Sequence, residues 1–312
     1  MIKVDLITGF LGAGKTTFLK KYAGYFIKQG KKVGILENDY GAVNVDMLLL
    51  NELRGDNCEL EMVAGACDDD CHKRRFKTKL ISMGMSGYDR VIIEPSGIFD
   101  VDEFFDSLRE DPLDRWYEIG NVITIVDAKL EEELSEISDF YLASQVANAG
   151  CIMLSKSQLA TEDEVEAAIE HLKRASLEVK CKRDIDDIVI KKDWNELDDS
   201  DFAKISTCGY ELSSYVKKKL SKETEYSTIY YLEHGLNMND MKEKIPQLFD
   251  DSQYGEIFRV KGFFKEEDGS WYEINSTKKE SEINKIKVGQ EVIIVIGSDI
   301  NKENIDRMLG IS

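Results

Sequence analysis

The sequence predicts an α/β fold, with a mostly parallel sheet in a first domain and a small α+β domain after it. Two observations support this prediction. Short apolar runs alternate with helix-spaced apolar residues through the first half of the chain. A charged stretch, Lys217–Glu225, then separates that half from a strand-rich end. We therefore expect a first domain of residues 1–222 and a second of residues 223–312.

Five apolar runs of the first domain read as buried strands: Lys3–Thr8, Lys32–Leu36, Arg90–Glu94, Val122–Val126 and Cys151–Leu154. Between them lie segments with helical spacing: Thr16–Gln29, Lys73–Met85, Val101–Arg109 and Ser135–Asn148. Thr161 and Glu164 form a capping-box pattern, which predicts a further helix through Ala175. We expect a last strand at Ile188–Ile190 and a helix at Asp198–Ile205.

The second domain shows strand patterns and two helical patterns, and the turn Glu266–Gly269 joins two of the strands. The predicted strands are Tyr226–Glu233, Glu256–Phe264, Ser270–Asn275 and Val292–Ile296. The predicted helices are Met238–Phe249 and Lys302–Leu309. The expected order is therefore β-α-β-β-β-α.

The composition limits the possible partners of the chain. Its 312 residues carry a formal net charge of −19 without a long basic run, which argues against nucleic-acid binding. The six scattered cysteines suit a reducing compartment better than a disulfide framework. No apolar stretch approaches the roughly 20 residues that span a bilayer. We expect a cytoplasmic protein with no signal peptide and no membrane or nucleic-acid partner.

Residues Gly9–Thr16 read G-x-x-x-x-G-K-T, the pattern of a loop that holds nucleotide phosphates. A strand-like run precedes it and a helical pattern follows, as a phosphate on a helix N-terminus requires. We expect Lys15 to reach the β- and γ-phosphates and the Thr16 hydroxyl to ligate Mg²⁺. The predicted nucleotide-binding residues here are Gly12, Ala13, Gly14, Lys15, Thr16 and Thr17.

A second motif, Val91–Gly97, supplies the other parts that a triphosphatase needs. Glu94 ends a buried parallel strand, at the edge where ligands bind in such sheets, and could hold Mg²⁺ or its waters. Gly97 follows three residues later, so its amide could approach the terminal phosphate without a side chain in the way. The predicted catalytic residues are thus Lys15, Glu94 and Gly97, with no strong candidate for a general base.

The segment Glu37–Gly41 follows another strand and brings two carboxylates, Glu37 and Asp39, to the same edge. Either could assist Mg²⁺ or hold a second metal ion. A solvated acidic loop is the alternative, because charged loops are common.

Taken together, these motifs resemble the CobW family of P-loop GTPases in residues and in order. The resemblance covers nearly the whole chain, from Gly9–Thr17 to the late Gly255–Gly262 and Val295–Gly297. It also includes, between these, Glu37–Gly41 with Asp46, Glu94–Gly97, Val122–Ala128 and Gln145–Lys156. It implies a Rossmann-like GTPase domain, a CobW-type C-terminal domain, slow GTP hydrolysis and, in many members, metal delivery to client enzymes.

The segment that reads the base departs from the family pattern Asn-Lys-x-Asp. The matching residues are Ser155, Lys156, Ser157 and Gln158, so an amide replaces the carboxylate. Gln158 forfeits the charge-assisted contact with guanine, and such contacts are roughly twice as strong as neutral ones. We therefore expect Ser155, Lys156 and Gln158 to contact the base, with a weakened preference for GTP and with ATP as a rival.

The metal motif departs as well. Where the family has Gly-Cys-x-Cys-Cys, this chain has Ala66 in the first cysteine position and lacks the last. Cys67, Cys71 and His72 remain, with Cys58 nearby, and Glu37 or Asp39 could complete a site for Zn²⁺, Co²⁺ or Fe²⁺. Cys67 and Cys71 would share a face if their segment were helical. The alternative is an acidic surface loop with two thiols.

The predicted function is a Mg²⁺-dependent nucleoside triphosphatase, with GTP as the expected substrate. It would act as a conformational switch that assists metal or metallocofactor delivery to a client metalloprotein or cofactor enzyme. Two alternatives stay open: an ATP-using or metal-free nucleotide-gated activator, and a kinase or transferase built on the same loop.

Overall fold

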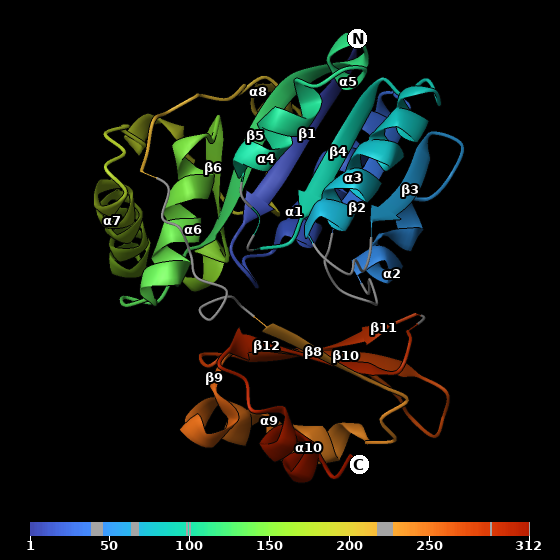
Figure 1. Ribbon diagram of the computed structural model, residues 1–312, viewed down its shortest axis with the longest axis vertical. Helices are drawn as coiled ribbons and strands as arrows, with labels where there is room; N and C mark the ends of the chain where they lie inside the picture. Colours follow the sequence, from blue (N-terminus) through green and yellow to red (C-terminus); the bar gives the residue numbers. More distant parts are fainter. Residues whose placement is uncertain are drawn as a thin grey trace. The chain divides into compact units, whose positions relative to one another are not determined.

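The computed structural model describes residues 1–38, 46–63, 69–97, 99, 101–216, 227–287 and 289–311. They form two compact units, each with its own sheet and core (Figure 1). The first unit carries a parallel sheet and the second an antiparallel one, so the predicted fold class is confirmed. The boundary expected after residue 222 lies outside the described residues and stays a prediction.

The larger sheet has seven strands in the order β3-β2-β4-β1-β5-β6-β7, and all of its pairings are parallel. Their bounds are β1 (Ile2–Gly9), β2 (Val33–Asn38), β3 (Cys58–Val63), β4 (Arg90–Pro95), β5 (Tyr117–Asp127), β6 (Cys151–Ser155) and β7 (Val189–Ile190). The predicted strands are present, and β3 is an addition. Because all strands run the same way, their carboxyl ends meet at one edge, where such sheets bind ligands.

Helices connect these strands: α1 (Lys15–Lys28), α2 (Asp46–Leu50), α3 (Asp69–Gly84), α4 (Val101–Leu108), α5 (Leu113–Trp116), α6 (Glu136–Ala147), α7 (Glu162–Glu178) and α8 (Asp199–Ile205). The predicted capping box of α7 is confirmed. The Thr161 hydroxyl accepts from the Glu164 N–H at 3.2 Å, and the Glu164 carboxylate accepts from the Thr161 N–H at 2.8 Å. The short helices α2 and α5 were not expected.

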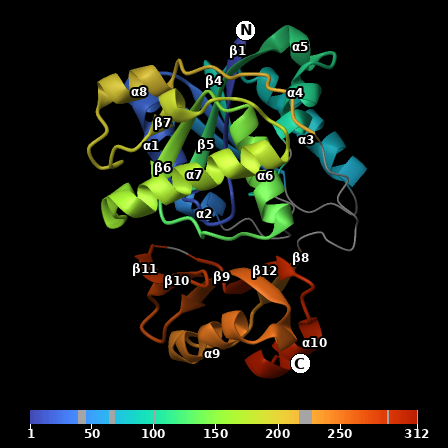
Figure 2. The same cartoon turned by 90° about the vertical axis from the view of Figure 1, so that its left-hand side faces the viewer.

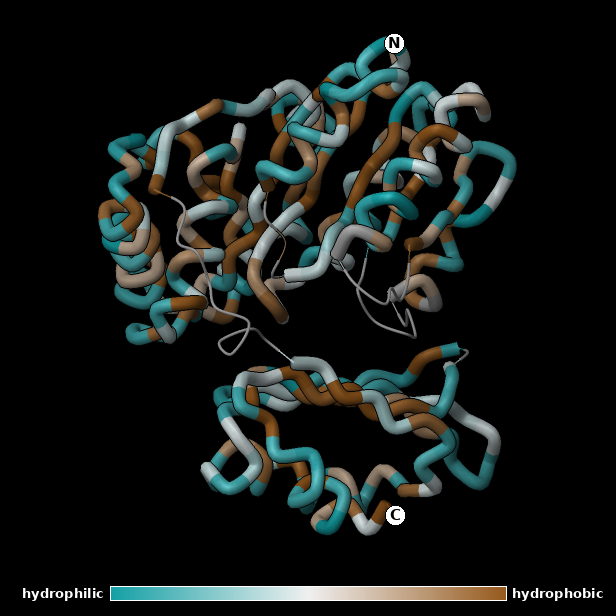
Figure 3. Tube along the Cα trace, in the orientation of Figure 1, coloured by the Kyte–Doolittle hydropathy of each residue, from teal (hydrophilic) through white to brown (hydrophobic). Residues whose placement is uncertain are grey.

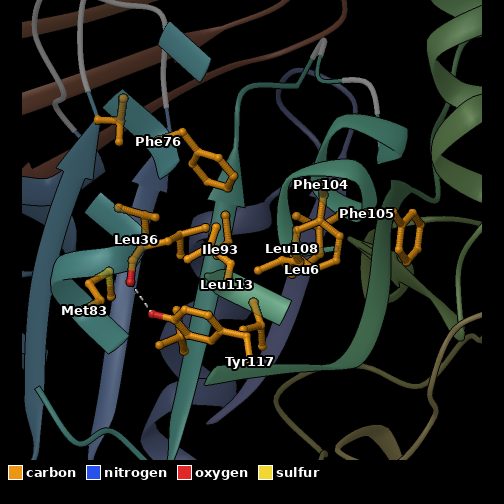
Figure 4. Packing of buried hydrophobic residues seen from close by; sticks show 14 of the residues in the cluster. Leu6, Leu36, Phe76, Met83, Ile93, Phe104, Phe105, Leu108, Leu113 and Tyr117 are labelled. Atoms are coloured by element: carbon orange, nitrogen blue, oxygen red, sulfur yellow. Dashed lines mark hydrogen bonds between the residues drawn. The ribbon is translucent and has the colours of Figure 1, made fainter. Parts of the chain in front are cut away.

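One face of the sheet is covered by α3, α4 and α5, whose aromatic and aliphatic side chains meet Leu6, Leu36 and Ile93 of the strands (Figure 4). The Tyr117 hydroxyl of β5 donates to the Leu80 carbonyl of α3 at 2.6 Å, which joins this layer of helices to the sheet. Further along the same face, α6 and α7 cover β5 and β6. The opposite face carries α1 and α8, which lie behind the strands in Figure 1 and to the left of them in Figure 2.

Figure 3 shows that apolar residues are concentrated on the strands of this sheet and that polar residues are more frequent outside them. One charged group nevertheless lies in the core. Asp5 of β1 is 0% exposed and forms an ion pair with Arg90. Its carboxylate also accepts hydrogen bonds from the Tyr22 hydroxyl at 2.8 Å and from the Asn121 side-chain amide at 2.8 Å. These bonds compensate a burial that would otherwise be costly.

The second unit has five strands in the order β11-β10-β9-β12-β8. Their bounds are β8 (Ser227–Leu232), β9 (Glu256–Lys265), β10 (Trp271–Ser276), β11 (Ser281–Ile286) and β12 (Val292–Ser298). Two helices, α9 (Met238–Asp250) and α10 (Lys302–Leu309), cover one face of this sheet (Figure 1). The predicted order β-α-β-β-β-α is wrong by one strand, because β11 was not expected.

None of the helices in the described part of the chain is both long and apolar enough to cross a bilayer.

Candidate functional site

The phosphate loop runs from the end of β1 to the start of α1. Gly14 occupies the position before the helix with φ +95°, a left-handed conformation that side-chain-bearing residues rarely adopt. The helix then begins at Lys15, and its first turn contains no acidic residue. The N–H groups and the positive dipole end of α1 therefore meet at this loop, which is the arrangement that binds anions.

The Lys15 side chain folds back over the loop. Its ammonium donates to the Gly9 carbonyl at 3.1 Å and to the Phe10 carbonyl at 3.5 Å. The side chain is almost fully buried. A positive charge is thus held against the same loop as the helix N-terminus, where it can neutralise phosphate oxygens.

The structure brings together the two residues predicted to hold Mg²⁺. The Thr16 hydroxyl on α1 donates to Oε1 of Glu94 at the end of β4, at 2.8 Å. Glu94 is 4% exposed. Hydroxyl and carboxylate oxygens are the hard ligands that Mg²⁺ prefers, so this pair fits the ion chemically.

A second carboxylate lies beside Glu94. Glu37 on β2 is in register with Glu94 on β4, so both side chains lie on the face of the sheet that carries α1. Glu37 is 3% exposed. Positive charge near two buried carboxylates stabilises their ionised forms, so a cation bound at this edge of the sheet would stabilise both. Asp39, the other predicted ligand of this segment, lies outside the described residues.

The turn after β4 passes directly over the phosphate loop. A β-carbon on Gly97 would stand 2.6 Å from the backbone nitrogen of Leu11, so only glycine fits at this position. The Ser96 N–H donates to the Asn38 carbonyl at 2.9 Å, which ties the turn to β2. Gly97 therefore contacts the loop as its predicted role requires.

The predicted base-reading segment begins at the end of β6. Ser155 is the last, buried residue of the strand, and Lys156 adopts φ 54°. The Lys156 ammonium forms an ion pair with Asp127 at 2.9 Å. Gln158 lies in a short 3₁₀ turn, Ser157–Leu159, and is exposed. The structure thus places all three predicted residues near the carboxyl end of β6.

The sequence profile of the CobW/HypB/UreG nucleotide-binding domain family matches residues 3–185, more than half of the 312 residues. The chain belongs to this family. The resemblance inferred from the sequence is therefore confirmed. Since members of the CobW/HypB/UreG family are P-loop GTPases, the predicted enzyme class, a P-loop nucleoside triphosphate hydrolase, is confirmed as well.

Named relatives of the CobW/HypB/UreG type share modest identity with the chain. It is 24% identical over 325 residues to the "zinc-regulated GTPase metalloprotein activator 1" of Schizosaccharomyces pombe, covering 90% of this chain and 76% of the relative. It is 32% identical over 175 residues to the "zinc chaperone YjiA" of Escherichia coli, covering 52% of each chain. Zn(II)-bound YjiA GTPase from E. coli has a crystal structure, which is 21% identical at a TM-score of 0.38, covering 99% of this chain and 98% of that one.

The residues that replace the family's cysteine cluster are only partly described. Helix α3 begins at Asp69, four residues before its predicted start, so Cys71 and His72 fall in its first turn. Consecutive helical residues point about 100° apart, so these two side chains do not share a face. Within the described ranges, no group of three His, Cys, Asp or Glu side chains could hold a metal ion. Cys67 lies outside those ranges, so its place in a cluster stays a prediction.

Cys58, which the sequence placed near this cluster, lies elsewhere. It begins β3, whereas the segment of Cys67 follows the end of that strand at Val63. Five residues of extended chain separate the two ends by roughly 17 Å. Burial, with the neighbouring Glu59, raises the pKa of the Cys58 thiol to about 11, so the thiolate needed for a metal is disfavoured.

The site also contains residues that the sequence reasoning missed. A β-carbon on Gly14 would lie 3.5 Å from the Trp194 ring and 3.6 Å from the Ser155 β-carbon. Trp194 thus lies where the phosphate loop meets the base-reading strand, and its ring packs edge-on against Phe18. A lone tryptophan among charged residues just after β7 was the signal that could have identified it. Gln145 of α6, which the resemblance included without a role, also belongs to the site, because its side chain donates to the Gly97 carbonyl.

Proposed function

We propose that this protein binds GTP with Mg²⁺, hydrolyses it slowly, and uses the cycle to deliver a metal ion, best represented by zinc, to a client protein. The contact that carries this proposal is the Thr16–Glu94 hydrogen bond at 2.8 Å, with Glu37 in register beside it. Membership of a GTPase family supports the hydrolysis. The names of the two relatives, a zinc chaperone and a metalloprotein activator, support the cargo.

The chemistry needs little more than positioning and charge. Thr16 and Glu94 would hold Mg²⁺, which when bound supplies positive charge to the β- and γ-phosphate oxygens. Lys15 and the N-terminal amides of α1 add further positive charge, and the Gly97 N–H senses the terminal phosphate. No described residue near Glu94 is an obvious general base, which suits a slow switch.

Guanine is the base that family membership favours, and the structure offers a test of it. Gln158 cannot make the charged contact of the family aspartate, which favours ATP as a second candidate. In competition binding we expect GTP to win over ATP by less than ~10³-fold, and Gln158→Asp to raise that preference roughly tenfold. Equal affinity for the two nucleotides, unchanged in Gln158→Asp, would favour ATP use and contradict guanine reading by this segment.

The proposed cargo site combines Glu37 with Cys67 and one of Cys71 and His72, since these last two do not share a face of α3. The strand β2 that carries Glu37 lies directly beside β3, after which the cysteine segment follows. We expect wild type to bind Zn²⁺ in competition with a chromophoric chelator, and the Cys67→Ala, Cys71→Ala double variant to lose one equivalent. Cys208→Ala is the control, because Cys208 lies after α8, outside this edge of the sheet. If wild type and the double variant bind the same number of Zn²⁺ ions per chain, the metal-delivery proposal is wrong.

An assay without an acceptor molecule distinguishes GTP hydrolysis from phosphate transfer to a substrate. We expect GTP and Mg²⁺ alone to release inorganic phosphate, without any acceptor molecule. GDP that forms only when a small-molecule acceptor is added, together with phosphorylated acceptor and no inorganic phosphate, would identify a kinase instead.

A further inference from the structure

Helix α6 buries an amide side chain against the turn that senses the phosphate. Gln145 is 0% exposed, and its Nε2 donates to the Gly97 carbonyl at 2.9 Å. The backbone of Gln145 is held in turn by β5, because the Thr124 hydroxyl donates to the Gln145 carbonyl at 2.9 Å. The Gly97 peptide is therefore tied, through one side chain, to both a helix and a central strand.

The Gly97 peptide has little room to move on its other side. Its α-carbon lies so close to the phosphate loop that a β-carbon would stand 3.0 Å from the Leu11 α-carbon. No described residue accepts a hydrogen bond from the Gly97 N–H. Gly97 thus lies between the loop and α6, its carbonyl bound by Gln145 and its N–H available to a ligand. The Gly97 N–H lies in the peptide plane that joins Ser96 to Gly97. The Ser96 N–H, which donates to the Asn38 carbonyl at 2.9 Å, anchors the chain on one side of this plane, and the bound Gly97 carbonyl anchors it on the other.

Stability does not explain why this position holds a glutamine. In the part of the chain that the structure describes, Gln145 Oε1 has no hydrogen-bond partner. A buried amide with an empty acceptor destabilises a fold relative to an apolar side chain of the same shape. The bond from Gln145 to the Gly97 carbonyl is therefore the property that distinguishes it from such a side chain.

We propose that Gln145 is a positioning residue for the nucleotide switch: it holds the Gly97 peptide in place, so that the Gly97 N–H can reach the terminal phosphate. This inference rests on the proposed function only in requiring that a nucleoside triphosphate binds the loop. The same hydrogen bond also links the turn to α6, so a shift of the turn would move α6. On α6, Asp139 contacts His171 of α7 at 2.6 Å.

The test compares triphosphate with diphosphate binding. Gln145→Met keeps the length and apolar volume of the side chain but removes the donor. We expect its affinity for a non-hydrolysable GTP analogue with Mg²⁺ to fall roughly tenfold, the size of one hydrogen bond. GDP affinity should stay within about twofold of wild type, since GDP lacks the terminal phosphate. Isothermal titration calorimetry measures both, and kcat should fall while the KM for GTP rises.

Two further variants complete the design. Ser144→Ala is the matched control, because Ser144 is also buried on α6 but donates to the Tyr141 carbonyl of its own helix, at 2.8 Å. It should leave both affinities unchanged. Thr124→Val loosens the Gln145 backbone from β5 and should lower the triphosphate-to-diphosphate ratio in the same direction, which keeps the proposal testable if Gln145→Met folds poorly.

The ratio of GTP-analogue affinity to GDP affinity, rather than either affinity alone, decides the outcome. Equal loss of GTP-analogue and GDP affinity in Gln145→Met, or no loss of either, would show a structural role only and overturn the proposal. If wild type prefers adenine nucleotides, the guanine proposal fails, and the same ratio measured with an ATP analogue and ADP still tests Gln145.

Discussion

Thr16 and Glu94, 78 residues apart in the chain, are joined by a hydrogen bond of 2.8 Å at the carboxyl edge of the larger sheet. Because the bond links the first turn of α1 to the end of β4, any loss of charge at Glu94 acts where phosphates bind. The first prediction concerns this carboxylate.

We expect Glu94→Gln to lower the rate of Mg²⁺-dependent GTP hydrolysis by roughly 100-fold or more, since it removes the charge that holds the metal and its waters. GDP binding without Mg²⁺ should change little. Phosphate release and titration calorimetry measure the two effects. Glu118→Gln, on an exposed residue of β5, is the control and should hydrolyse GTP at the wild-type rate. A Glu94→Gln variant with wild-type turnover would refute the assignment.

The second prediction concerns Trp194, whose ring lies between Gly14, Ser155 and Phe18. Trp194→Ala should lower the free energy of unfolding of the first unit by about 3–5 kcal/mol, because the cavity it leaves cannot be filled by its neighbours. It should also weaken nucleotide binding, since Gly14 and Ser155 both lose a packing partner. Urea unfolding with and without GDP measures both, and Trp194→Phe should recover most of the stability.

The third prediction concerns the buried ion pair of Asp5 and Arg90. Arg90→Met should destabilise the first unit by about 3–5 kcal/mol, because it leaves the Asp5 carboxylate buried without its cationic partner. Adding Asp5→Asn to Arg90→Met should restore part of that loss, as the double variant no longer buries a charge. For comparison, the exposed pair of Arg115 and Asp111 should contribute less than about 1 kcal/mol. Full additivity of the Asp5 and Arg90 variants in urea unfolding would contradict the coupling.

The fourth prediction is a pH dependence in the second unit. Burial lowers the pKa of His234 below its usual value, although Glu291 at 3.7 Å opposes the shift. The neutral ring is the form that fits, since Nδ1 accepts from the Leu236 N–H at 3.0 Å. A depressed pKa in the folded state stabilises the fold above the unfolded-state value of 6.5, and this contribution is lost as the pH falls through the folded-state value.

Hydrogen exchange resolved by peptide should therefore show faster opening of β9 and β12 at pH 5.5 than at pH 7.5. His234→Gln retains an acceptor but cannot be protonated, so its exchange should depend much less on pH. The same pH dependence in wild type and His234→Gln would assign the effect to other groups.

The sequence predicted the parts of the fold that carry a strong local signal. The phosphate loop, the apolar strands around it and the capping box of α7 all specify their structure within a few residues of chain. The strand β3 escaped because Glu59 and Glu61 interrupt its apolar pattern on the exposed face. The strand β11 escaped for a different reason: five of its six residues are exposed, so pairing with β10 rather than burial makes it a strand.

The candidate site was predictable where one motif contains the chemistry, and less so where separate segments meet. Lys15, Thr16 and Glu94 could be assigned from their motifs, and the sheet order then brought Thr16 and Glu94 together. Trp194 and Gln145 contact these motifs only through tertiary packing, so no residue spacing in the sequence predicts their contacts. The roles of all of these residues stay predictions until the variants are measured.

The strand order of the larger sheet has a consequence for how such a protein can evolve. The residues that depart from the family's base-reading pattern follow β6, whereas those that depart from its cysteine pattern follow β3, and the two strands are five positions apart in the order. At about 4.8 Å per strand, that is roughly 24 Å. The segment expected to read the base and the segment expected to hold a metal ion can therefore change independently of one another, while the phosphate loop between them stays the same.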